Sequence, residues 1–233
     1  MGHNAAPRMP LPKQIKWVTT NCYGALVDRD KGAVAAFRKE ADRVGFSFDE
    51  KELLGHFHEI QREIMSGSYE LYAEVLRRTA IETAKRLGWD LEPSRAQFLP
   101  DSIANWPPYR EANAAMERLR KKYEIGIISN IDDKLLGVSR RHLREDLDIV
   151  VTAQQVRSYK PDPAHFKECA RRIGGKRGWV HVGSDYETDV LPLIQMRVPV
   201  IWLNRSGEDL DKRRKPTEEV RTLRDATKLL NAA

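Results

Sequence analysis

The chain has few cysteines and no long apolar run, and each shortage excludes a class of protein. Only two of its 233 residues are cysteines, Cys22 and Cys169, and they lie far apart, so we expect no disulfide framework. No stretch approaches the roughly 20 apolar residues that cross a bilayer. Residues 1–13 lack the apolar core of a secretory signal and are interpreted as a flexible tail. We therefore expect a cytoplasmic protein with no membrane partner.

Aromatic residues are also scarce, at 8%, and they do not interleave with the basic runs. The net charge of +6 comes largely from residues 118–122, 171–177 and 212–215. Surfaces that bind single-stranded nucleic acid combine basic side chains with aromatic rings on which bases stack. We interpret the basic runs as solvated helix ends and turns, and expect no nucleic-acid partner.

What the chain does contain is an ordinary globular balance, with 41% hydrophobic and 32% charged residues. Apolar runs that are typical of buried strands occur at residues 15–19, 125–129, 148–152, 179–182 and 198–203. Helical patterns separate the later runs, at residues 109–122, 134–143, 163–173 and 190–196. Strands that alternate with helices predict an α/β fold with a doubly wound parallel sheet.

Between the first and second of these strands the alternation stops. The intervening residues predict three helices and a connection, at 34–45, 49–66, 68–87 and 93–108. An all-helical insertion at this place would lie over the cleft as a cap and exclude water. We therefore divide the chain into the tail, an α/β core of residues 14–32 and 109–233, and a cap of residues 33–108.

Polar residues follow several of the strands, and ligands bind beyond the carboxyl ends of strands in such sheets. The residues expected to converge there are Asn21, Ser129, Asn130, Lys160, Ser184 and Asp185. They belong to four motifs, at residues 18–28, 127–130, 158–163 and 181–189. On these motifs the chain resembles the haloacid dehalogenase-like hydrolase superfamily, and within it the type II 2-haloacid dehalogenases. The resemblance implies a Rossmann-like core, a helical cap, a small carboxylate substrate and, as one option, a homodimer.

Asn21 departs from that family. The family pattern is hydrophobic-Phe-Asp-x-Tyr-Gly-Thr-Leu, in which the aspartate attacks the substrate, whereas this chain has Asn21 there, with Thr20 and Ala25 as further departures. A neutral amide is a far poorer nucleophile than a carboxylate. Four readings stay open: a hydrolase with altered chemistry, an inactive or trapped protein that binds a small anion or a protein partner, deamidation that restores an aspartate, and an engineered change from aspartate.

Tyr23 stands where the phosphatases of the superfamily commonly have a second aspartate. Magnesium is usually bound through one or two carboxylates, and both positions lack one here. We therefore expect no metal and no cofactor. Cys22, between the two, is a candidate for substrate contact, with a buried structural cysteine as the alternative.

The later motifs supply the remaining candidates for catalysis. The resemblance makes Lys160 the lysine that neutralises nucleophile and substrate. We hypothesise that Asp185 activates water while Asn21 orients the substrate, with Asp189 as a second carboxylate. The alternative is that both aspartates only pair with Lys160 and cap the next helix.

Substrate binding is assigned to polar residues of the core and of the cap. Ser129, Asn130 and Ser184 are candidates in the core, although Ser129 or Asn130 would equally cap the following helix. The resemblance places an arginine that grips the substrate carboxylate near residues 57–62, where His58 and Arg62 are both candidates. Arginine suits a carboxylate better, because it pairs in a bidentate way.

Overall fold

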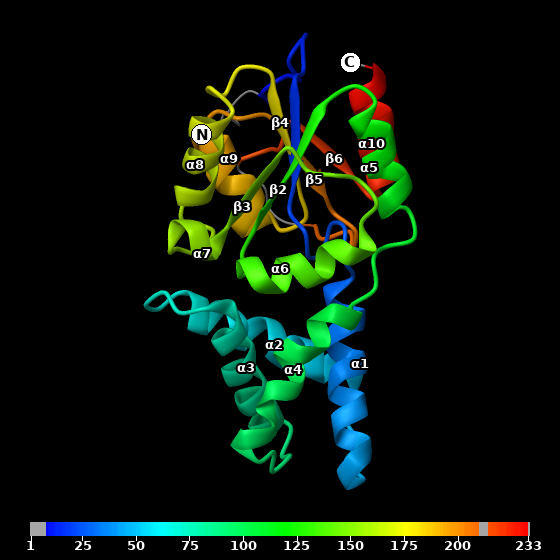
Figure 1. The fold of residues 1–233 in the computed structure, drawn as a ribbon, viewed down its shortest axis with the longest axis vertical. Coiled ribbons are helices and arrows are strands. Elements are labelled where there is room, and N and C mark those ends of the chain that lie inside the picture. Colours follow the sequence, from blue (N-terminus) through cyan, green and yellow to red (C-terminus); the bar gives the residue numbers. More distant parts are fainter. Residues whose placement is uncertain (1–7, 210–213, 233) are drawn as a thin grey trace, which may run out of the picture.

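The computed structural model describes residues 8–209 and 214–232, and in that part of the chain six strands form one parallel sheet (Figure 1). The strands are β1 (Trp17–Thr20), β2 (Glu124–Ser129), β3 (Ile149–Thr152), β4 (Trp179–Gly183), β5 (Val200–Leu203) and β6 (Glu218–Val220). Their order is β3-β2-β1-β4-β5-β6, and every neighbouring pair is parallel. The predicted doubly wound sheet is confirmed, and β6 is an addition to it.

Helices cover both faces of this sheet (Figure 1). They are α5 (Ala112–Arg120) and α10 (Leu223–Ala232) on one face, with α8 (Ala164–Arg172) and α9 (Leu191–Gln195) on the other. Successive strand side chains point to opposite faces, so adjacent residues join different apolar clusters. Ile127 packs in the cluster that contains Leu119 of α5, and Ile128 packs in the cluster that contains Phe166 of α8.

A group of four helices lies apart from the sheet, at the bottom of Figure 1. This helical group consists of α1 (Arg29–Ala41), α2 (Glu50–Met65), α3 (Tyr72–Arg86) and α4 (Phe98–Ser102). Phe37 of α1 and Phe57 of α2 are fully buried in it, with ring centroids 6.4 Å apart. The Asp28 side chain accepts a hydrogen bond from the Lys31 amide, so α1 begins at Arg29, five residues before the predicted start.

Other boundaries differ from prediction where turns are tighter or looser than an α-helix. The predicted helix at 190–196 starts as a π-helical turn, Tyr186–Val190, before α9. Two shorter helices are α6 (Asp133–Ser139), which a 3₁₀ turn follows, and α7 (Ala153–Val156). Within the described ranges, no helix has the length and apolarity to cross a membrane.

Candidate functional site

A cavity of about 490 Å³ lies between the carboxyl ends of the strands and the helical group. Ten of the predicted site residues line it: Asn21, Tyr23, His58, Arg62, Ser129, Asn130, Lys160, Ser184, Asp185 and Asp189. The convergence follows from the parallel sheet, in which the segments after β1, β2 and β4 leave at one edge. The chemical roles of these residues stay predictions.

The Asn21 side chain makes three hydrogen bonds within the protein. Its Nδ2 donates to the Tyr23 carbonyl oxygen at 2.6 Å and to Ser184 Oγ at 2.7 Å, while its Oδ1 accepts from the Ser184 amide at 3.1 Å. The two backbone partners fix the orientation of the amide, because a carbonyl only accepts and a backbone N–H only donates. Both Nδ2 hydrogens are therefore used, so only Oδ1 has capacity left for the substrate contact that we predicted.

A carboxylate at position 21 would match these partners less well. One oxygen would accept from the Ser184 amide, but the other would face the Tyr23 carbonyl oxygen, where two acceptors repel. The turn itself requires Gly24, whose φ is +85° and where an added Cβ would lie 2.6 Å from Ser184 Oγ. The loop between β1 and α1 thus fits a neutral amide.

Lys160 and Asp189 form a buried ion pair in the wall of the cavity, with side chains only 4% and 1% exposed. Asp189 Oδ2 also accepts from the amides of Ser184 and Asp185, each at 3.1 Å. Lys160 Nζ donates further to the Ile128 carbonyl at 3.3 Å. The pair is neutralised internally, so Asp189 has little capacity left to act as a base.

The Asn130 amide holds the backbone of residue 160 from both sides. Its Oδ1 accepts from the Lys160 amide at 2.8 Å and its Nδ2 donates to the Lys160 carbonyl at 3.1 Å. Asn130 therefore positions Lys160 and makes no cap for α6. Asp185 does serve as a cap, because its Oδ1 accepts from the Thr188 amide at 2.8 Å at the start of the π-helical turn.

Cys22 does not line the cavity, contrary to prediction. Its side chain is fully buried in the apolar cluster that contains Val18, and burial raises the pKa of its thiol to about 12 against the opposing effect of Lys160. A thiol with this pKa is protonated at neutral pH and is no nucleophile. Tyr23 forms part of the cavity wall, where its hydroxyl hydrogen-bonds with Ser139 Oγ at 2.6 Å.

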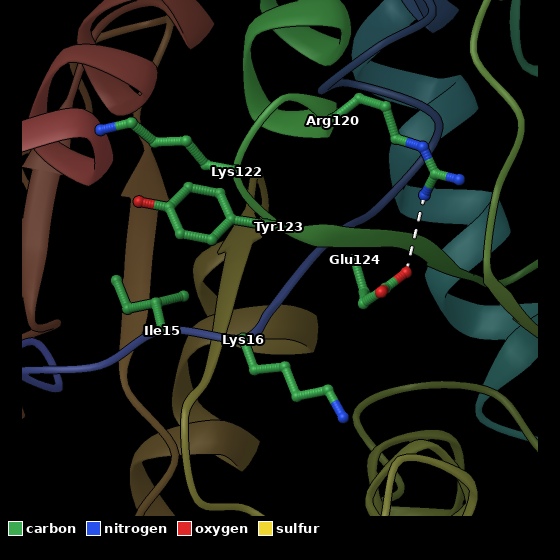
Figure 2. A pocket seen from close by; sticks show the side chains of 6 residues that line it. All are labelled: Ile15, Lys16, Arg120, Lys122, Tyr123 and Glu124. Atoms are coloured by element: carbon green, nitrogen blue, oxygen red, sulfur yellow. Dashed lines mark ion pairs between the residues drawn. The ribbon is translucent and has the colours of Figure 1, made fainter.

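A second hollow, of about 410 Å³, lies at the opposite edge of the sheet (Figure 2). Its cations do not converge: Lys16 and Lys122 point away from each other, and Arg120 pairs with Glu124 at 3.7 Å (Figure 2). An anion site needs donors that face one point, so this hollow is no candidate. Among the described residues, no three His, Cys, Asp or Glu side chains gather where a metal ion would bind.

Comparison with known proteins places the chain in a family. A family model described as haloacid dehalogenase-like hydrolase matches residues 15–196. The chain belongs to this family. The predicted resemblance is therefore confirmed at the level of the superfamily, and a hydrolase is the activity that the family supports.

Relatives of this haloacid dehalogenase-like hydrolase include two (S)-2-haloacid dehalogenases. The enzyme of Pseudomonas sp. (strain YL) is 25% identical over 155 residues, which make up 65% of this chain and 67% of that protein. The enzyme 4A of Burkholderia cepacia is 24% identical over 194 residues, 80% of this chain and 82% of that one. The fold is similar to that of the L-2-haloacid dehalogenase of Xanthobacter autotrophicus with chloropropionic acid covalently bound, with a TM-score of 0.80 at 20% identity over 94% of this chain and 99% of that chain.

This hydrolase also has cavity residues that sequence reasoning missed. Arg29 and Asp30, the first two residues of α1, line the cavity, and Arg29 Nε donates to Asp30 Oδ1 at 3.2 Å. The signal in the sequence was a charged pair just after the first motif. It was overlooked because α1 was expected to begin at residue 34.

Arg205, which follows β5, was missed as well. Its Nε and Nη2 donate to the carbonyls of Gly24 and Ala25 at 3.1 and 2.8 Å, and its Nη1 pairs with Glu111 at 2.7 Å. The guanidinium carbon also lies 3.7 Å from the centroid of the Tyr109 ring. Arg205 therefore stabilises the loop that carries Asn21. No local sequence pattern predicts such a long-range contact.

Proposed function

We propose that this chain is a metal-independent hydrolase of a small carboxylate of the 2-haloacid type, in which water replaces residue 21 as the attacking group. The hydrogen bonding of Asn21 carries the proposal. Its amide is neutral, both of its N–H bonds are used by Tyr23 and Ser184, and it lies where the relatives' family has a nucleophilic aspartate. The names of the two relatives support a 2-haloacid as the substrate class.

The cations around the cavity suit a carboxylate. Lys160 is held by Asp189, whereas Arg29 and Arg62 border the cavity from the helical group. Arg29 Nε contacts Asp30, and among the described residues its two terminal nitrogens have no hydrogen-bond partner. A guanidinium with two such nitrogens can bind a carboxylate in a bidentate way. We propose that the helical group acts as a cap that brings these arginines to the substrate.

Asn21 also supports the proposed independence from metal. Its Nδ2 approaches the Tyr23 carbonyl to 2.6 Å and so supplies the positive partner that this oxygen would otherwise seek in a cation. A divalent ion at that point would have to displace a hydrogen bond and would gain no carboxylate. A cytoplasmic location, a homodimer and the absence of nucleic-acid partners stay predictions.

The second candidate is an inactive protein that binds a small anion. The same geometry favours it, because both N–H bonds of Asn21 are used within the protein and Asp189 is held by Lys160 and two backbone amides, so neither side chain is free to act as a nucleophile. The cavity and its arginines would then serve binding alone.

Halide release from (S)-2-chloropropionate separates the two. We expect turnover by the wild-type chain, unchanged by a metal chelator, and in a single turnover in heavy-oxygen water the product should carry solvent oxygen. The N21D variant offers a matched control, because an attacking carboxylate would give the product a protein oxygen first. Intact mass, measured before the assay, ensures that the wild-type sample still contains Asn21.

Other results would overturn the proposal. Turnover by N21D alone would identify a disabled or trapped dehalogenase. Turnover by neither chain would indicate a different substrate or the binding role, which calorimetry with the same carboxylate would test.

A further inference from the structure

A carboxylate and an imidazole meet at the edge of the cavity, where the helical group adjoins the core. Asp30 Oδ1, on α1, lies 3.1 Å from His58 Nε2, on α2. The same oxygen accepts from Arg29 Nε, and all three side chains line the cavity that contains Asn21. Asp30 and His58 lie on different helices, so their contact depends on how α1 and α2 pack.

The contact with Asp30 selects one tautomer of the His58 imidazole. Burial opposes ionisation of Asp30, but its contacts with His58 and Arg29 hold the pKa of its carboxyl well below the usual range. An ionised Asp30 attracts the hydrogen of Nε2, which leaves Nδ1 as the nitrogen with a lone pair. Among the described residues only Nε2 of His58 has a polar partner, which leaves Nδ1 open to the solvent side, and the His58 side chain is 25% exposed.

His58 is also neutral where a base is needed. Burial lowers its pKa below the ordinary value, and the nearby charges of Arg29 and Arg62 add to this effect while Asp30 opposes it. Of the five histidines in the described part of the chain, His58 alone borders the cavity. His165 and His181, by contrast, are fully buried.

We infer that His58 is the general base that takes the proton from the attacking water, and that Asp30 is its positioning residue. The inference rests on the proposed function. The water oxygen forms a bond to C2 of the 2-haloacid, the carbon–halogen electron pair leaves with the halide, and the water proton passes to His58 Nδ1 and then to solvent. The products are a 2-hydroxy acid, halide and a proton, and no other reactant is required.

The rival base is Asp185, which we predicted from sequence. It also borders the cavity, but its Oδ1 accepts from the Thr188 amide, and an aspartate that serves as a helix cap cannot turn toward substrate without breaking that bond. His58 has an unoccupied nitrogen and a carboxylate behind it, so the geometry favours His58.

The test compares H58A with H56A, a matched control on the same helix. His56 lies 3.8 Å from Glu52 and does not border the cavity. With 2-chloropropionate we expect H58A to lower kcat for halide release by about 100-fold or more, as loss of a general base does. H56A should leave kcat unchanged, and both variants should unfold at similar temperatures. Added imidazole should restore part of the activity of H58A alone.

A pH profile adds a readout that a structural role would not change. The active form of His58 is neutral, so kcat/KM should fall as pH drops through a pKa below the ordinary histidine value. D30N should move this acid limb to lower pH, because Asp30 raises the pKa of His58. If H58A were as active as H56A, the inference about His58 would be overturned and the proposed function would stand. Loss of turnover in D185N would then identify Asp185 as the base. No halide release by the wild-type chain would overturn the proposed function and the inference with it.

Discussion

Two aspartates border the cavity, one paired with a lysine and one with a neutral histidine, and the two pairs differ in how far water reaches them. Lys160 and Asp189 lie under the carboxyl edge of the sheet, with side chains 4% and 1% exposed. Asp30 and His58 join α1 to α2, with side chains 46% and 25% exposed. The buried pair also hydrogen-bonds with the backbone of Ile128, Ser184 and Asp185, and so it fixes the shape of the site. In the accessible pair of Asp30 and His58, the imidazole Nδ1 has no partner in the described part of the chain, and proton transfer requires such a nitrogen with a free lone pair.

K160M, which disrupts the buried pair, should lower the stability of the protein more than any other variant considered. The substitution leaves the Asp189 carboxylate buried without a counter-charge, and loss of one partner of a buried pair costs about 3–5 kcal/mol. Urea denaturation should therefore show a much lower midpoint than for the wild-type chain. K160M with D189N should recover part of the loss, because no charge is then buried alone. A K160M midpoint equal to that of the wild type would contradict the burial of the pair.

The next largest effect should come from D132A, which separates the helical group from the core. Asp132 precedes α6, is 4% exposed, and accepts from the amides of Tyr72 and Ala73 at 2.8 Å each. It thus satisfies the first amides of α3 from outside that helix. Loss of these charge-assisted hydrogen bonds should cost about 2 kcal/mol. Amide hydrogen exchange should show lost protection at residues 72 and 73.

D49A serves as the control for that measurement. Asp49 caps α2 within the helical group, where it accepts from the Glu52 amide at 2.9 Å, so its hydrogen bond lies within one helix. It should cost about 1 kcal/mol as an ordinary exposed cap. If D132A cost no more than D49A, the anchoring of α3 by the core would be refuted.

The elements that could be predicted from sequence are those whose residues signal burial locally. β1 to β5 were found because each lies in a stretch rich in apolar residues, and their parallel pairing follows from the helices between them. β6 was missed because two of its three residues are glutamates and only Val220 is buried. A short edge strand of this kind is identified by its pairing with β5, which no local pattern reveals.

The site divides in the same way. Asn21, Ser129 and Lys160 could be placed because they belong to recognisable motifs, two of them at the ends of strands. The prediction for Cys22 was wrong because the sequence at the end of a strand does not reveal which side chains turn into the core. Arg205 reaches the loop after β1 from 180 residues away, and such contacts depend on tertiary packing.

D30N tests the accessible pair, because it removes the charge of Asp30 beside His58. The depressed pKa of Asp30 means that its ionised form stabilises the fold above the ordinary aspartate pKa of about 4, and that this contribution is lost as pH falls below it. D30N should therefore unfold at a slightly lower temperature than the wild type at neutral pH. The difference should shrink near about pH 3. The effect should be far smaller than that of K160M, since water screens the pair. An equal difference at both pH values would contradict this origin.

The smallest effect should come from E59Q, which removes a pair that is close but exposed. Glu59 lies next to His58 in α2 and contacts Arg86 of α3 at 2.8 Å, a shorter distance than that between Asp30 and His58. Its side chain is 53% exposed and that of Arg86 is 33% exposed. Arg86 also keeps Glu63 as a second partner at 3.1 Å. Water and salt screen such pairs, so E59Q should change stability by less than about 0.5 kcal/mol and should not alter halide release. A loss comparable with that of K160M would show that distance rather than burial sets the strength of these pairs.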